Sequence, residues 1–150
     1  MMSRTRTALG LCAATLSVGA LVAAADAATS TKYSASMSGA QETPANGSKA
    51  TGKTTITVTG KRLCYVITSS NLGGSAAAAH IHKGAKGKNG PVFIAFFGAP
   101  KALKNGKISG CVTTTTAKAK AIAAKPSAYY ANVHTVKYPS GAMRGQLKKS

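Results

Sequence analysis

The stretch Thr54-Thr55-Ile56-Thr57-Val58-Thr59, followed by Leu63-Cys64-Tyr65-Val66-Ile67-Thr68, decides the fold. The first segment alternates polar and apolar residues, which is typical of a strand with one buried face. The second segment is apolar and β-branched, which suits a central strand lying next to the first. Gly60-Lys61 is a turn between them. The sequence therefore predicts two adjacent strands here.

The same pattern continues along the chain, with turn residues at short intervals. Further strands are predicted over residues 76–82, 92–97, 107–112, 129–135 and 142–147. One helix is predicted over Ala117–Lys125, because Pro126 stops it. Seven to nine short strands at this spacing predict an all-β fold, an antiparallel sandwich or Greek-key barrel with at most one short helix.

The N-terminus has the features of an export signal. Arg4 and Arg6 precede an apolar stretch over residues 8–25, and Ala25-Asp26-Ala27 fits the small-x-small rule for cleavage. We expect a signal peptide over 1–27, a short polar tail over 28–32 and a β domain over 33–150. Cleavage after Ala25 and an uncleaved membrane anchor are the alternatives. With cleavage no transmembrane segment remains, and the protein is secreted, periplasmic or held in the cell envelope.

The charge balance of the mature chain is strongly one-sided. The chain has 20 Lys and Arg and two acidic residues. Removal of Arg4, Arg6 and Asp26 with the signal leaves 18 cations, one carboxylate (Glu42) and a net charge of +17. Paired-carboxylate catalysis, a Ser-His-Asp triad and carboxylate cages for calcium or magnesium all need acids that are missing. The composition therefore favours a protein that is not an enzyme.

The excess of cations points to anionic partners. A field of this size attracts polyanions, and salt-sensitive attachment to anionic envelope polymers is the expected form. Sequence-specific nucleic-acid binding is not expected, because Arg is scarce, Trp is absent and no recognition module is present.

Cysteine usage agrees with export. Cys12 falls in the signal, which leaves Cys64 and Cys111 in the mature chain. An even number of cysteines in an oxidising compartment predicts a disulfide. The alternative makes one cysteine a copper ligand.

All three histidines of the chain fall in two short segments. His80 and His82 are two residues apart in a predicted strand and so project from the same face. His134 on another strand would complete a three-nitrogen metal site, suited to Cu(II) or alternatively Zn(II). The competing interpretation is that the three imidazoles only hydrogen-bond to loop backbones.

Other side chains are candidates for supporting such a site. Tyr130, Tyr138 and Glu42 are possible additional ligands, and Tyr130 has the same strand parity as His134. Glu42 and Arg144 are expected to pair, because the single acid of a basic chain needs a cationic partner. The pair either orients a ligand histidine or serves as a structural salt bridge.

Three motifs resemble those of the CHRD domain, a module named after chordin and also found singly in exported bacterial proteins. They are Ser38–Pro44 (SGAQETP), Ala79–His82 (AHIH) with Asn89–Val92 (NGPV), and the closing set Asn132–Thr135 (NVHT), Tyr138-Pro139 and Gly141–Leu147 (GAMRGQL). The resemblance covers about residues 33–148. It implies an immunoglobulin-like β fold in an extracellular or periplasmic setting and implies little about activity. Ala142 is a departure, because the family often carries an acid there.

Taken together, the residues predict an exported, non-catalytic, metal-binding domain with copper as the expected metal. The alternative from another class is an envelope adhesion module that binds anionic polymers through its basic surface. A copper enzyme of superoxide-dismutase type ranks last, because the sequence has no bridging histidine and no Asp for a second metal.

Overall fold

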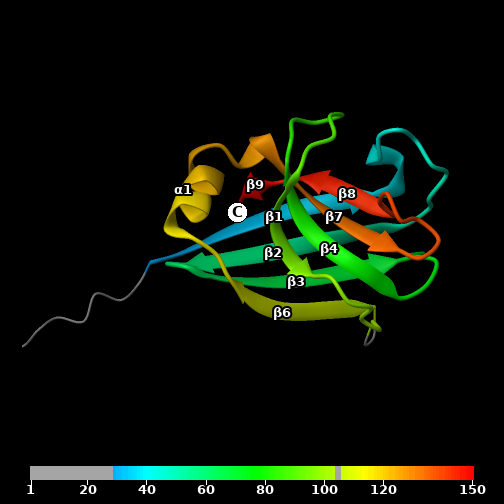
Figure 1. Ribbon diagram of the computed structural model, residues 1–150, viewed down its shortest axis with the longest axis horizontal. Coiled ribbons are helices and arrows are strands. Elements are labelled where there is room, and N and C mark those ends of the chain that lie inside the picture. The colour runs from blue at the N-terminus through cyan, green and yellow to red at the C-terminus, as the bar shows by residue number, and fades with distance from the viewer. Residues whose placement is uncertain (1–28, 104–105) are drawn as a thin grey trace, which may run out of the picture.

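The computed structural model describes residues 29–103 and 106–150, and strands dominate this part of the chain (Figure 1). The elements are β1 (Ser30–Ser38), η1 (Gly39–Gln41), β2 (Thr51–Thr59), β3 (Arg62–Ser70), β4 (Ala76–Lys83), β5 (Val92–Phe97), β6 (Lys107–Thr113), α1 (Thr116–Ala124), η2 (Pro126–Ala128), β7 (Tyr129–Thr135), β8 (Met143–Gln146) and β9 (Lys148–Lys149). Among the described residues, no helix has the length and apolarity needed to cross a membrane.

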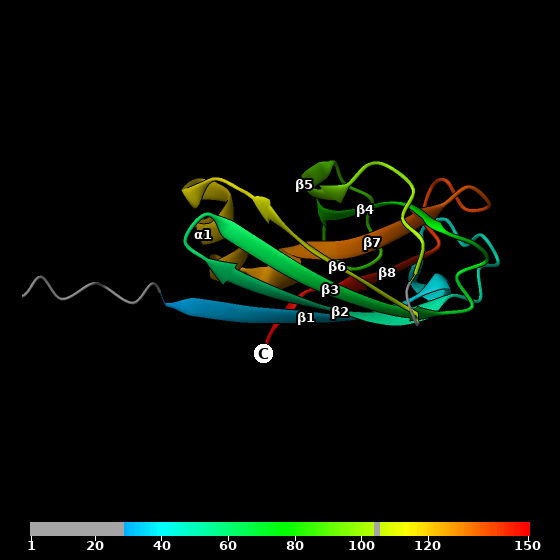
Figure 2. The same ribbon diagram turned by 90° about the horizontal axis from the view of Figure 1, so that it is seen from below.

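The strands form one antiparallel sheet in the order β5-β4-β7-β8-β1-β2-β3-β6, with β9 paired to β1. The sheet curls into a nearly closed barrel, so that β1, β2, β3 and β6 lie across from β4, β7 and β8 (Figure 2). Strands β5 and β6 are the two ends of the path and have no ladder between them. The predicted class is confirmed: the fold is all-β and antiparallel, with one short α-helix.

The predicted adjacent strands are β2 and β3, paired over their full length from Thr51↔Ser70 to Thr59↔Arg62. Their inward faces carry Thr54, Ile56 and Tyr65, which are buried, whereas Thr55, Thr57 and Thr59 of β2 point to the outer face. The alternation of polar and apolar residues in the sequence therefore arises because one face of the strand is buried and the other is exposed to solvent.

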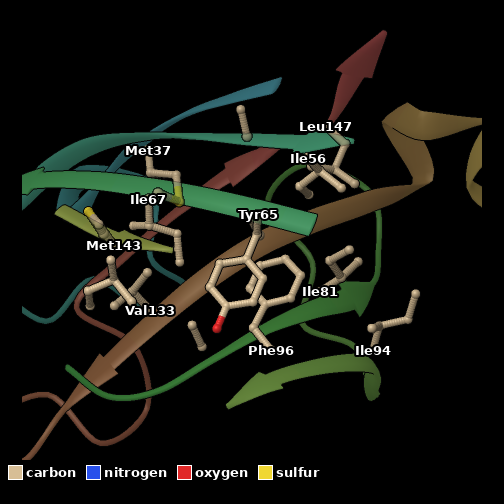
Figure 3. Close-up of a cluster of buried hydrophobic side chains, with 14 of the residues drawn as sticks. Met37, Ile56, Tyr65, Ile67, Ile81, Ile94, Phe96, Val133, Met143 and Leu147 are labelled. Atoms are coloured by element: carbon tan, nitrogen blue, oxygen red, sulfur yellow. The ribbon is translucent and has the colours of Figure 1, made fainter. Parts of the chain in front are cut away.

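The core fills the space between the two halves of the curled sheet. Tyr65 and Phe96 stack at its centre with ring centroids 4.5 Å apart (Figure 3). Ile81, Val133 and Met143 approach from the opposite strands and are at most 1% exposed. Because β4 and β7 each contribute inward apolar residues, their alternate residues must face outward, and this outer face holds the candidate site.

The predicted disulfide is confirmed, and it joins Cys64 of β3 to Cys111 of β6. The two residues are directly opposite in the ladder, with their Cα atoms 3.9 Å apart. Their bond closes a sequence separation of 47 residues. On the chain-entropy model, a loop of this length gives about 4 kcal/mol of stabilisation.

Most strand boundaries differ from the sequence prediction by three residues or fewer, and two differences have a clear structural basis. Strand β1 begins at Ser30, inside the segment expected to be a polar tail, and Lys32 pairs with Thr57. The helix runs over Thr116–Ala124, one residue earlier than predicted, because the Thr115 side chain accepts a hydrogen bond from the Lys118 amide and begins it. The predicted signal peptide over 1–27 lies outside the described residues.

Candidate metal centre

Strands β4 and β7 place the three histidines on the outer face of the sheet. In β4, Ala79 and Ile81 are fully buried in the core, so His80 and His82 between and after them project outward. β7 pairs with β4 so that Ala78 lies opposite His134. The antiparallel register therefore brings an imidazole that is 54 residues distant in sequence beside the β4 pair.

The three imidazoles form one cluster. His80 Nδ1 lies 3.2 Å from His134 Nε2, and one ring nitrogen from each histidine lies within 4.8 Å of the others. Two nitrogens bound to one ion at the usual bond length of about 2.0–2.1 Å are at most about 4.2 Å apart. Around a tetrahedral ion the nitrogens lie about 3.4 Å apart, so side-chain rotations that shorten the widest separation are needed to bring all three to one ion. The predicted proximity of His134 to the β4 pair is thus found.

Backbone carbonyls fix the tautomers of two of the histidines. His82 Nδ1 lies 2.9 Å from the Gly90 carbonyl oxygen, and His134 Nδ1 lies 3.0 Å from that of Pro139. A carbonyl oxygen only accepts, so each Nδ1 carries the proton and each Nε2 keeps its lone pair. His82 Nε2 is buried and has no hydrogen-bond partner among the described residues. This is the arrangement of metal-ligating histidines, whose second nitrogen donates to a carbonyl or a carboxylate.

Burial keeps the imidazoles neutral. It lowers the pKa of His80 to about 4, helped by the neighbouring charges of His134 and His82. Burial also lowers the pKa values of His82 and His134, while their carbonyl partners oppose the shift and the Arg144 charge adds to it. A neutral imidazole is the form that binds metals, so the cluster can coordinate an ion without a net loss of protons.

The structure places the candidate additional ligands as follows. Tyr130 stacks on His82 with ring centroids 4.9 Å apart, and its hydroxyl accepts a hydrogen bond from the Gly90 amide. Tyr138 packs against the hydrophobic core cluster. Glu42 is bonded to two other side chains and does not belong to the histidine group. Tyr130 therefore packs directly beside the histidines. The roles of Tyr130, Tyr138 and Glu42 as additional ligands stay predictions.

A buried polar network adjoins the histidines. Arg144 Nε donates to Glu42 Oε2 at 2.8 Å, and the Asn132 amide donates to Glu42 Oε1 at the same distance. Arg144 Nη2 also donates to Asn89 Oδ1 at 2.8 Å, and the guanidinium carbon lies 4.8 Å from the centroid of the Tyr130 ring. Burial raises the pKa of Glu42, and the bonds to Arg144 and Asn132 oppose that shift. The expected pairing of Glu42 with Arg144 is present.

Comparison with protein families shows that residues 33–147 match the CHRD domain. The chain belongs to the CHRD family. CHRD domains occur in extracellular proteins, and the disulfide is consistent with that setting. No match is found among curated proteins or among solved structures.

The three CHRD motifs meet at one place in the fold. The opening motif contributes Glu42, the central motif His80 and His82, and the closing set His134 and Arg144. The motifs are far apart in sequence, yet hydrogen bonds and ring contacts connect their side chains on the outer face of β4, β7 and β8. The resemblance therefore describes a structural cluster as well as a fold.

Sequence reasoning gave no role to several residues of this cluster. Asn132 bridges Glu42 and the Met143 carbonyl. The histidines hydrogen-bond to the backbone carbonyls of Gly90 and Pro139, and backbone groups cannot be recognised from the identity of a side chain. Asn89, Gly90 and Asn132 all belong to the CHRD-like motifs, and this membership was the only feature of the sequence that could have indicated their role.

Proposed function

We propose that this CHRD domain is an exported, non-catalytic metal-binding protein that holds one ion with His80, His82 and His134. One observation carries the proposal: the buried Nε2 of His82 has no partner among the described residues, while its Nδ1 is bonded to a carbonyl. A buried acceptor without a partner costs about 1–3 kcal/mol. A metal ion at this position uses that lone pair and removes the cost.

The donor set favours copper. Three neutral imidazoles without a thiolate or a free carboxylate suit Cu(II) and, as the alternative, Zn(II). His80 Nδ1 faces His134 Nε2, so in the metal-free protein His80 donates this hydrogen bond. Metal binding through His80 Nδ1 requires the His80 proton to move to Nε2. The proposed role is to sequester or carry the ion outside the cytoplasm.

The test is a titration of the protein with Cu(II) and, separately, Zn(II) by calorimetry, with electron paramagnetic resonance of the copper form. We expect one ion per chain and couplings to three nitrogens. The chain has no other histidine, so His82→Gln, His134→Gln and the triple Gln variant report on the cluster alone. Thr57→Ala, on strand β2 in the opposite half of the curled sheet, is the control and keeps wild-type affinity. A folded triple variant that binds Cu(II) as tightly as the wild type would sink the proposal.

A second candidate function is attachment to anionic envelope polymers. The observation that favours it is that Glu42, the one acidic side chain in the described residues, is already paired with the buried Arg144. No acidic side chain there remains to neutralise the lysines. This candidate predicts retention on an anionic matrix, release by moderate salt and no dependence on metal. Free passage through such a matrix at low salt removes it.

A further inference from the structure

The curled sheet has one unpaired seam, between β5 and β6, which approach each other along part of their length. These strands end the path of the sheet, and no ladder joins them (Figure 2). Two cavities line this side of the molecule. One, of about 610 Å³, lies between Val92–Ala95 and Thr113–Thr115, and the other, of about 500 Å³, is lined by Lys101, Ala102 and Lys107–Ser109. Together they extend along both ends of the β6 edge.

The free edge of β6 presents unpaired backbone groups. The short Cα–Cα distance between Cys64 and Cys111 is that of a non-hydrogen-bonded pair in an antiparallel ladder. By alternation, Ser109 and Thr113 have the same parity as Cys111. The N–H and C=O groups of these residues therefore point away from β3 and into the seam. No hydrogen bond between described residues reaches them.

The seam is also cationic and partly apolar. Lys118 crosses it, with Nζ donating to the Phe93 carbonyl at 2.7 Å and lying 5.3 Å from the Phe93 ring centroid. Lys101 lies 5.6 Å from the ring centroid of Phe97. Val92 is an exposed large apolar residue, 52% accessible. Lysine is thus placed at both ends of the seam, and no acidic side chain among the described residues is free to pair with it.

We propose that the β6 edge of this seam binds an extended acidic peptide by strand addition. Unpaired backbone groups fit a polypeptide, since an added strand gains main-chain hydrogen bonds there. The lysines select acidic side chains. A second copy of this chain is disfavoured as the occupant, because each copy carries a large positive charge that repels the other. The seven residues of β6 span about 23 Å, which sets the length of the partner strand.

The probe is a capped seven-residue peptide of alternating Val and Glu, added to the full mature protein at low salt. We expect saturable binding and slower amide hydrogen exchange at Ser109, Cys111 and Thr113. The same peptide with alternate amides N-methylated keeps its charge but loses donors, and we expect it to bind at least about threefold more weakly. A Val–Lys peptide should not bind.

One backbone variant isolates the strand pairing. The Ser109 N–H points into the seam and is not used by the β3–β6 ladder, so Ser109→Pro removes a donor at an edge position that tolerates proline. We expect Ser109→Pro to weaken peptide binding about three- to tenfold with little loss of thermal stability, and Ser109→Ala to bind like the wild type.

Three results overturn the proposal. The first is equal binding of the N-methylated peptide, which would indicate charge attraction alone. The second is exchange protection that maps to amides outside β6. The third is protection of the same amides without peptide, together with concentration-dependent dimers in sedimentation, which would assign the edge to a second copy. If Ser109→Pro fails to fold, the N-methylated peptide and the exchange map still decide.

Discussion

Replacing Glu42 by Gln should destabilise the domain by about 3 kcal/mol, the lower end of the range for removing one partner of a buried ion pair. The side chains of Arg144 and Glu42 are only 7% and 2% exposed, so water cannot replace the lost carboxylate. Arg144 would keep hydrogen bonds to the Thr43 carbonyl and the Asn89 side chain but would carry an uncompensated buried charge. For a domain of this size, 3 kcal/mol is a fall in Tm of about 12 °C.

Urea unfolding and calorimetry measure this cost, with Lys49→Gln as the control because it removes a charge from an exposed site on the same segment. The double variant Glu42→Leu with Arg144→Met should lose less than the sum of the two single changes, since neither charge is then left alone. A loss below 1 kcal/mol for Glu42→Gln, or additive single effects, would refute the reasoning. Cu(II) affinity of the folded variants separates the two roles: a structural salt bridge leaves the affinity unchanged, whereas positioning of His82 lowers it.

Three further outcomes are expected. Replacing Cys64 and Cys111 together by Ala should cost about 4 kcal/mol in urea unfolding, and a change under 1 kcal/mol would contradict the loop-entropy argument. The pKa of His80 falls from 6.5 to about 4 on folding, so the unfolded chain takes up its proton first and stability should drop as the pH falls from 6.5 to 4. The full shift corresponds to about 3 kcal/mol, which solvent screening of this partly exposed group reduces to about 1–2 kcal/mol; His80→Gln should lack this pH dependence. Gly90→Ala would drive a methyl group into the backbone carbonyl of Lys83 at the end of β4; we expect lower thermal stability and about tenfold weaker Cu(II) binding, whereas Gly98→Ala, where a Cβ meets nothing, should behave like the wild type.

The strands with strong alternation were predictable, and β1 was not. Its inward face carries Tyr33, Ala35 and Met37, but the residues between them are mostly serine, so the segment has little overall hydrophobicity. What holds β1 in the sheet is pairing with β2 on one side and with β8 and β9 on the other. Those contacts are non-local, and a single-sequence pattern does not contain them.

Some features of the candidate site could likewise be predicted from the sequence, and others could not. The spacing of His80 and His82 follows from strand periodicity, so their common face was predictable. The approach of His134 depends on the β4–β7 register, which is set by the burial of residues such as Ile81 and Val133 in the core. The carbonyls that orient the imidazoles belong to loops, and the sequence gives no side-chain signal for them.

Salt should affect the two candidate functions in opposite directions, and this separates them. A Cu(II) ion at three neutral imidazoles keeps its charge, because Glu42, the nearest acid, is already paired with Arg144. The surrounding lysines repel such an ion over distances that shrink from about 30 Å at 0.01 M salt to about 8 Å at 0.15 M. Raising the concentration of sodium perchlorate, whose anion coordinates poorly, should therefore strengthen Cu(II) binding, whereas it must weaken attachment to a polyanion. Calorimetric titration at the two salt concentrations measures the first effect and retention on an anionic matrix the second. Copper binding that weakens with salt in parallel with retention would mean that the ion does not sit among the histidines under this positive field.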